Sequence, residues 1–148
     1  MIIISHRGNI SGPSPKFENN PKFVTEAIHA GYDCEVDVWY ENDRLYLGHD
    51  KPQYEISLKF LKNDKFWCHA KNLPSLEFMI KNDIHCFWHQ EDNYTLTSRG
   101  FIWAYPGMPL VKDSICVMPE KAKWDTFNNC SGICTDYPNR YRRITDEL

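Results

Sequence analysis

Residues 31–40 read Gly-Tyr-Asp-Cys-Glu-Val-Asp-Val-Trp-Tyr, and this stretch decides the fold of the chain. Its β-branched and aromatic side chains predict a strand over residues 34–40. Successive side chains of a strand point to opposite faces. Val36 and Val38 therefore share one face, and Glu35 and Asp37 share the other. If the valines pack under helices, the two acids point into the opposite side of the sheet.

Glu35 and Asp37 are two carboxyl groups placed close together on one strand face. In a low-dielectric interior their charges repel and favour protonation of one of them. A divalent cation removes this penalty, and carboxylate oxygens suit Mg²⁺ or Ca²⁺. The alternation alone is equally consistent with a metal site and with a solvent-facing strand edge on which the two acids have no functional role.

Apolar runs and helical patterns alternate on both sides of this strand, which indicates an α/β fold. Further strands are predicted at residues 2–5, 45–47, 66–70, 85–89, 101–105, 114–118 and 132–135. One helix is predicted to begin at Pro21, with Asn20 as its N-cap, and two more helices are predicted over residues 57–62 and 74–81. The second half leaves little room for helices, and residues 1–148 are expected to form one domain.

Composition excludes several classes of protein. The chain has 148 residues and a net charge of −3, which does not suit a protein that coats nucleic acid. No apolar run approaches the roughly 20 residues that span a bilayer, and the first residues do not resemble a signal peptide. We therefore expect a cytoplasmic protein.

The six cysteines are Cys34, Cys68, Cys86, Cys116, Cys130 and Cys134. Four of them lie in apolar, strand-like runs, where a free cysteine behaves as a small buried hydrophobic residue. We expect reduced, structural thiols. Cys130 and Cys134 could contribute to a zinc site, but a lone Cys-x-x-x-Cys is weak evidence for zinc.

Two short motifs place a histidine directly after a predicted strand. His6-Arg7-Gly8 follows residues 2–5, and Gly48-His49-Asp50 follows residues 45–47. An arginine can hold a phosphate oxygen in a bidentate manner, and a glycine lets the backbone approach a ligand closely. Each motif alone is a weak signal, because a histidine that follows a strand is more often an ordinary packed residue, and Gly48-His49-Asp50 also fits an ordinary turn.

Two later strands also carry ionisable groups at alternate positions. His69 and Lys71 share one strand face, and a lysine there could stabilise developing negative charge. The alternative is an ion pair with Glu35 or Asp37. His85 and His89 share a face as well, and we interpret them as hydrogen-bonded core residues rather than as ligands.

Taken in order, four motifs resemble the glycerophosphodiester phosphodiesterase family, within the phosphodiesterases that are similar to phosphatidylinositol phospholipase C. These motifs are His6-Arg7-Gly8, Glu18-Asn19, Glu35-x-Asp37 and His49-Asp50. Residues 132–138, Gly-Ile-Cys-Thr-Asp-Tyr-Pro, are similar to the closing Thr-Asp-x-Pro segment of that family. The resemblance is strong over residues 1–50, fair around Lys71 and residues 135–138, and poor between.

The resemblance implies a role for each matching residue. It implies that Glu35 and Asp37 bind a divalent metal, and that His6 and His49 form the acid/base pair, with His49 as the acid. It implies that Arg7 and Lys71 hold the phosphate. It also implies that Glu18 contacts His6 or Arg7 and supports it without contacting the phosphate itself.

The chain departs from that family at one metal ligand and in its length. The family has Glu-x-Lys on its third strand, where this chain has His69-Ala70-Lys71, so His69 takes the place of an anionic ligand. This change weakens Ca²⁺ binding and favours a softer metal, or it marks a damaged site. The family fold is a (β/α)₈ barrel, which needs about 250 residues. We therefore expect a reduced or incomplete (β/α)₈ TIM-type barrel that lacks several helices in its second half.

These observations predict a metal-dependent phosphodiesterase that acts on a glycerophosphodiester or a similar phospholipid headgroup. The alternatives are a phospholipase-D-like enzyme that forms a cyclic phosphate, a phosphate-ester-binding module without turnover, and a small structural zinc protein. The expected partner is a small-molecule phosphodiester rather than nucleic acid. Apolar sheet left bare by missing helices would be covered by homodimerisation or by packed aromatic side chains.

Overall fold

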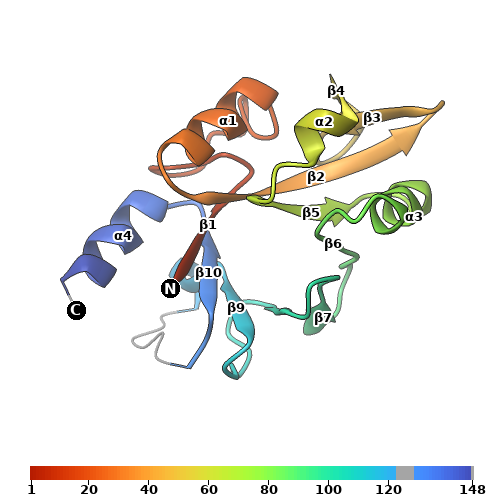
Figure 1. The fold of residues 1–148 in the computed structure, drawn as a ribbon. Helices are drawn as coiled ribbons and strands as arrows, with labels where there is room; N and C mark the ends of the chain where they lie inside the picture. Colours follow the sequence, from red (N-terminus) through yellow and green to blue (C-terminus); the bar gives the residue numbers. More distant parts are fainter. Residues whose placement is uncertain (123–128, 148) are drawn as a thin grey trace.

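The computed structural model describes residues 1–122 and 129–147, and Figure 1 shows its strands and helices. The strands are β1 (Ile2–His6), β2 (Asp33–Glu41), β3 (Arg44–Leu47), β4 (Tyr54–Ile56), β5 (Phe66–Ala70), β6 (Cys86–Phe87), β7 (Tyr94–Leu96), β8 (Ile102–Ala104), β9 (Ser114–Val117) and β10 (Gly132–Thr135). The helices are α1 (Pro21–His29), α2 (Leu58–Leu61), α3 (Leu73–Lys81) and α4 (Pro138–Asp146), with a 3₁₀ turn, η1 (Pro119–Lys121).

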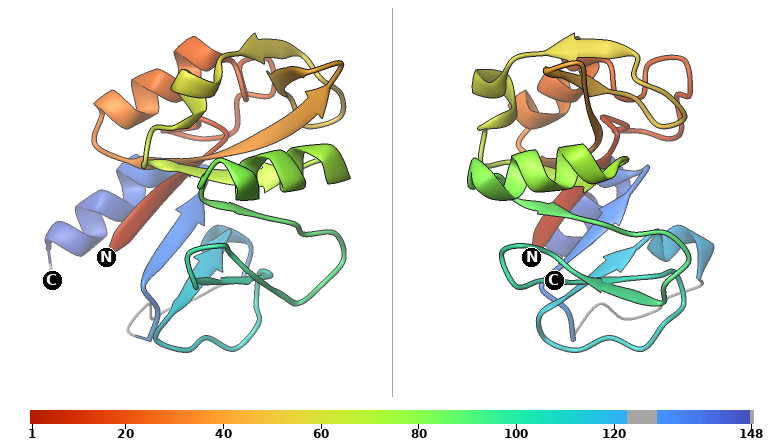
Figure 2. Two further views of the ribbon diagram at one scale, coloured as in Figure 1. Left: turned by 45° about the vertical axis from the view of Figure 1, so that its right-hand side comes forward. Right: turned by 90° about the vertical axis from the view of Figure 1, so that its right-hand side faces the viewer.

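The strands of the described residues form one mixed sheet. Its centre is parallel, in the order β6-β5-β2-β1-β10-β9-β8. The hairpin β3-β4 adds antiparallel strands to β2, and β7 pairs antiparallel with β8. Figure 2 shows that the sheet curls, so that the carboxyl ends of its parallel strands face a common space.

The prediction of a reduced (β/α)₈ TIM-type barrel is wrong. The structure is a strand-rich half-barrel: β6 pairs only with β5 in the described residues, and three of the strand pairs are antiparallel. The turn at Asn42 and Asp43 explains part of the difference, because both residues have positive φ, of 53° and 61°. Such a two-residue turn makes a tight hairpin, whereas a parallel connection needs a dozen or more residues.

Strand β2 separates two apolar clusters. Cys34, Val36 and Val38 point to the outer face, where they pack with Val24 of α1 and Met79 of α3. The inner side of the curl holds a second cluster, in which Trp67, Phe87 and Trp103 pack against Ile4 and Ile115. Aromatic side chains thus fill the interior of the half-barrel.

The chain ends in a helix that the sequence did not predict. α4 packs beside β1, and the guanidinium of Arg142 lies 4.1 Å from the centre of the Tyr32 ring and donates to the Ala30 carbonyl. Arg142 therefore ties α4 to the segment between α1 and β2. Each helix within residues 1–122 and 129–147 falls short of the length and apolarity that crossing a membrane demands.

Candidate functional site

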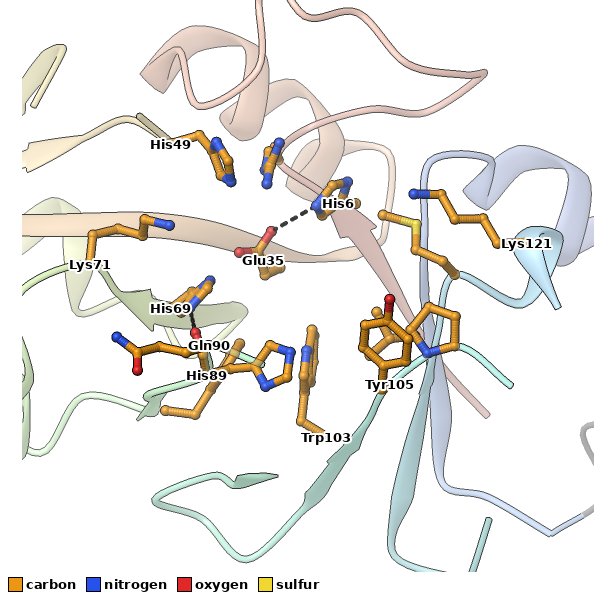
Figure 3. A pocket seen from close by; sticks show the side chains of 15 residues that line it. His6, Glu35, His49, His69, Lys71, His89, Gln90, Trp103, Tyr105 and Lys121 are labelled. Carbon is orange, nitrogen blue, oxygen red and sulfur yellow. Dashed lines mark hydrogen bonds and ion pairs between the residues drawn. The ribbon is translucent and has the colours of Figure 1, made fainter. Parts of the chain in front are cut away.

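A cavity of about 700 Å³ opens at the carboxyl ends of the parallel strands. Ligand sites of open α/β sheets form at this edge, because the strands end there side by side. Six of the eight predicted site residues line the cavity: His6, Arg7, Glu35, His49, His69 and Lys71. Figure 3 shows His6, Glu35, His49, His69 and Lys71 around a common space. The other two, Glu18 and Asp37, lie behind this wall in contact with Arg7.

Glu35, Asp37 and His69 form the one group of three or more potential metal ligands found within residues 1–122 and 129–147. One ligand atom from each lies within 4.8 Å of the others. The parallel pairing of β2 with β5 produces this arrangement, because Asp37 is in register with His69. The two acids are almost completely buried, with exposed fractions of 3% for Glu35 and 0% for Asp37. They do not lie on a solvent-facing strand edge.

The two acids of this cluster differ in their electrostatics. Burial and the nearby charge of Asp37 raise the pKa of Glu35 well above its usual value. Burial alone would raise the pKa of Asp37 too, but the His69 ring and the Arg7 guanidinium lower it below its ordinary range. Without a cation, Asp37 therefore carries the charge, while Glu35 tends to stay protonated.

Two buried carboxylate oxygens lack a hydrogen-bond donor among the described residues. They are Glu35 Oε2 and Asp37 Oδ1. His69 Nδ1 lies 3.2 Å from Asp37 Oδ1, but in a direction that does not suit a hydrogen bond. Buried polar atoms are normally satisfied, so two unsatisfied oxygens in one cluster call for a bound group. A cation between them would satisfy both.

His69 is oriented as a metal-ligating histidine would be. Its Nε2 atom lies 2.9 Å from the His89 carbonyl oxygen, so Nε2 must donate a proton there. Nδ1 then faces the two acids. Metal-bound histidines commonly donate their second ring N–H to a carbonyl or carboxylate, which fixes the tautomer.

Arg7 belongs to a strained turn that connects β1 to the acids. It has a φ of 58°, and the following Gly8 has a φ of 95°. A Cβ at Gly8 would lie 2.7 Å from the Phe23 ring, so only glycine fits there. Arg7 N donates to the Glu35 carbonyl, Arg7 Nε lies 3.0 Å from Asp37 Oδ2, and Arg7 Nη1 donates to Glu18. Arg7 therefore serves first to hold Asp37.

His6 presents its Nε2 atom to the cavity. Its Nδ1 atom lies 2.7 Å from Asp136 Oδ1, which also accepts a hydrogen bond from the Asn9 side chain. Burial raises the pKa of Asp136, but the hydrogen bond and charge of His6 outweigh this and lower it. Asp136 thus stays ionised and fixes the Nδ1 proton of His6. His6 Nε2 lies 3.8 Å from Glu35 Oε2.

His49 reaches the cavity from the hairpin. β1 and β3 pair with one edge of β2, and β5 pairs with the other edge. β1 pairs with the first residues of β2, and β3 pairs with its last residues. Gly48 N donates to the Asp37 carbonyl, which fixes the start of the turn that carries His49. His49 Nδ1 lies 2.7 Å from Asp50 Oδ1, so the Nδ1 atom of His49 has an aspartate partner, as that of His6 does. Its side chain is 45% exposed.

Lys71 completes the polar side of the cavity. Its backbone N–H donates to the Val38 carbonyl directly after β5. Within the described parts of the chain, its ammonium group has no carboxylate within 4.0 Å, and the alternative of an ion pair with Glu35 or Asp37 is therefore wrong for Lys71. His69 is the residue of this strand face that lies against an acid, with Nδ1 3.2 Å from Asp37 Oδ1.

Three residues that support the site were not singled out as site residues from the sequence. Asn19 is fully buried, and its side chain donates to Asp37 Oδ2 and accepts from Asp37 N. Asn9 joins Asp136 to Glu18. Asp136 orients His6. A signal existed for Asp136, which directly follows the last parallel strand, and for Asn19, which is adjacent to Glu18.

The buried thiols Cys34, Cys68, Cys86, Cys116 and Cys134 are free, as expected. Burial raises the pKa of Cys134 well above its usual value, which disfavours the thiolate that zinc needs. His85 is a core residue, as predicted, and contacts Thr97 Oγ1 at 2.8 Å. The same prediction is wrong for His89, which lines the cavity and whose Nδ1 atom has no hydrogen-bond partner among the described residues.

Comparison of the chain with protein-family models, with curated proteins and with solved structures found no match. The resemblance to the glycerophosphodiester phosphodiesterases therefore rests only on the residues quoted from the sequence.

Proposed function

We propose that this chain is a metal-dependent phosphodiesterase that acts on a small phosphodiester, such as a glycerophosphodiester or a phospholipid-like headgroup. One observation carries the proposal: two histidines present Nε2 to a cavity whose wall holds a buried acid pair with unsatisfied oxygens. Cationic Lys71 lies on the same wall. This combination suits a bound cation and a phosphoryl group.

The residues present fit a divalent metal ion. Glu35 and Asp37 would hold it with their unsatisfied oxygens, and His69 would hold it with Nδ1. Two carboxylates and one imidazole suit Mg²⁺ or a softer divalent ion better than they suit Ca²⁺. When bound, the ion would supply a positive charge that stabilises the phosphoryl oxygens. The raised pKa of Glu35 is the electrostatic cost that such a charge would remove.

The two histidines would move the protons. His6 Nε2 takes a proton from the attacking oxygen, which belongs to water or to a neighbouring hydroxyl of the substrate. As the new P–O bond forms, the bond from phosphorus to the leaving oxygen breaks, and His49 Nε2 donates its proton to that oxygen. His6 suits the role of base because Asp136 fixes its Nδ1 proton, which leaves Nε2 as the acceptor. His49 is closer to solvent and suits a departing alcohol.

Lys71 would contact the phosphate directly, because its ammonium group forms no ion pair within 4.0 Å in the described residues, although its charge acts on Glu35. Arg7 would act mainly through Asp37 and Glu18, to which it is already bound. Its remaining guanidinium surface lines the cavity and would add positive charge there.

The test is hydrolysis of bis(p-nitrophenyl) phosphate and of glycerophosphodiesters, after chelation and after addition of Mg²⁺, Mn²⁺ or Zn²⁺. We expect activity only with added metal and a loss of about 100-fold or more in His49→Ala. Glu35→Gln should lose metal binding and activity but keep the fold, because the neutral amide replaces a carboxyl that burial already keeps protonated. Asp37→Asn should lose activity too.

His29→Ala is the matched control, because His29 is exposed on α1 and should leave activity unchanged. Activity that survives both His49→Ala and Asp37→Asn would refute the proposal. Phosphorus NMR of the products separates hydrolysis by water from formation of a cyclic phosphate.

The exposure of His49 favours one second candidate, which is phosphate-ester binding without turnover. His49 hydrogen-bonds an aspartate, Asp50, whose side chain is 91% exposed, so its ring is not firmly fixed. Calorimetric binding of a glycerophosphodiester, without hydrolysis under any of the three metals, would establish this function instead.

A further inference from the structure

Lys121 lies at the far end of the same cavity, on an element that no step above uses. It ends η1, the 3₁₀ turn that follows β9. The turn is anchored: Met118 N donates to the Cys134 carbonyl, and the buried Pro119 leads into it. Glu120 accepts hydrogen bonds from Thr135 Oγ1 and Asp136 N. The backbone that carries Lys121 is therefore tied to the end of β10.

The ammonium group of Lys121 forms no hydrogen bond, and no ion pair within 4.0 Å, with a residue in the described parts of the chain, although its charge helps to lower the pKa of Asp136. Both oxygens of the neighbouring Glu120 accept hydrogen bonds. Figure 3 shows Lys121 and Lys71 on opposite sides of the cavity, with Glu35 and His6 between them. The cavity thus has a cation at each end and a candidate metal site near only one of them.

The two lysines follow strands that are far apart in the sheet, Lys71 directly after β5 and Lys121 in the turn after β9. β5 and β9 are separated by β2, β1 and β10, so four strand spacings of about 4.8 Å lie between them along the curl. A single phosphate held at the acid pair and Lys71 is therefore poorly placed to pair with Lys121 as well. A second anion at the other end of the ligand is better placed.

Part of the cavity wall is apolar. Trp103, Val117 and Met118 line it, and none of these side chains offers a strong hydrogen bond acceptor. Tyr105 and Pro106 also line the cavity. A ligand that bridges the two cations would therefore have charged ends, and an uncharged spacer between them could contact this apolar surface.

We propose that Lys121 forms a second anion subsite, which selects phosphodiesters that carry a carboxylate or a second phosphate beyond a short spacer, on the His6 side of the phosphorus. This inference deepens the proposed function and rests on it for the position of the first phosphate. Lys121 is a specificity-determining residue, because it contacts a part of the substrate away from the reacting phosphorus.

The probes are two phosphonate analogues of a glycerol phosphodiester, in which CH₂ replaces the leaving oxygen. One ends in a carboxylate and the other ends in a hydroxymethyl group of similar size. Calorimetry on the Mg²⁺-loaded protein measures the affinity of each. We expect the wild type to prefer the carboxylate by about tenfold, which is the contribution of one charge-assisted hydrogen bond. Lys121→Met should abolish this preference and leave the affinity for the hydroxymethyl analogue unchanged.

Lys112→Met is the matched control, because Lys112 is exposed before the amino end of β9, whereas Lys121 follows its carboxyl end. This control should keep the wild-type preference. The inference is overturned if the wild type shows no preference, if it binds neither analogue, or if the preference survives in Lys121→Met. Hydrolysis of the parent diesters is measured separately. A Lys121-dependent preference without hydrolysis would leave the subsite standing and refute the phosphodiesterase function.

Discussion

Asp136 and Asp50 each lie 2.7 Å from the Nδ1 atom of a histidine, but their surroundings differ. Asp136 has an exposed side-chain fraction of 11%, against 91% for Asp50. Asn9 holds Asp136 in addition. Water screens an exposed pair and leaves both side chains mobile, whereas a buried partner fixes the ring and its tautomer. His6 is therefore the more firmly oriented of the two histidines.

Asp136→Asn should lower phosphodiesterase activity by about 100-fold, because an amide no longer specifies which nitrogen of His6 carries the proton. The measurement is kcat/KM on the model diester, with far-ultraviolet circular dichroism to show that the fold is retained. Asp50→Asn makes the same chemical change at the exposed pair and should cost less than about tenfold. Equal losses in the two variants would contradict the difference in burial as the cause.

The charged residues of the site were predictable from the sequence, but their supports were not. Glu35 and Asp37 stand two residues apart on a strand, so the alternation alone placed them on one face. Asn9 carries no such signal, and Asn19 has only its place beside Glu18, because an asparagine can equally serve a turn, a cap or the surface. Only the fold shows that Asn19, with a φ of 66°, holds Asp37 by two hydrogen bonds.

At the scale of elements, the central strands and three helices were predictable, because their apolar periodicity and caps are local. The predicted helix cap Asn20 accepts from Lys22 N, as expected. β4 and β7 were missed because each has only three residues, too few to establish a pattern of alternation. α4 was missed because its composition is mostly polar. These elements depend on their partners in the sheet and against β1 more than on their own sequence.

The cap residues of α1 and α3 differ in the further hydrogen bonds that their side chains form. Asn20 caps α1 through Lys22 N alone. Asn72 caps α3 through Ser75 N, and its side chain also accepts from Tyr40 N and donates to the Tyr40 carbonyl. Asn72 therefore joins a helix to the end of β2, the strand that carries the acids.

Asn20→Ala should lower the free energy of unfolding by about 1 kcal/mol, the usual value of one cap. Asn72→Ala should cost about 2–3 kcal/mol, because the backbone groups of Tyr40 lose their partners as well. Urea unfolding with unchanged m-values measures both. Similar losses in the two variants would show that the tie to Tyr40 contributes nothing to stability.

At the scale of the whole molecule, aromatic side chains take over part of the role that helices have in a barrel. Trp103 lies with its ring centre 4.6 Å from that of Phe87, and Trp67 lies 6.0 Å from Trp103. The aromatic content favoured such packing, but no local pattern showed where the sheet stops. The end of the sheet depends on long-range contacts, such as the hydrogen bond from Ser98 N to the Cys86 carbonyl beside β6.

His85 belongs to this aromatic interior and links the stability of the whole fold to pH. Its ring centre lies 4.3 Å from that of Trp67, and its exposed fraction is 4%. Burial, with a smaller contribution from the charge of Arg99, lowers the pKa of His85 from 6.5 to about 4. The folded state therefore holds fewer protons on this group than the unfolded state does between these two pH values.

Protonation of His85 favours unfolding, so its contribution to stability is full above pH 6.5 and is lost as the pH falls towards 4. A difference of about 2.5 pKa units corresponds to about 3 kcal/mol. Glu35, whose raised pKa has the opposite sign, regains stability on acidification, so the total curve mixes both effects. The measurement is therefore a difference: urea unfolding of wild type and His85→Phe, without metal, across this range. The wild type should lose about 3 kcal/mol relative to the variant, whereas parallel curves would show that His85 becomes protonated without unfolding the protein.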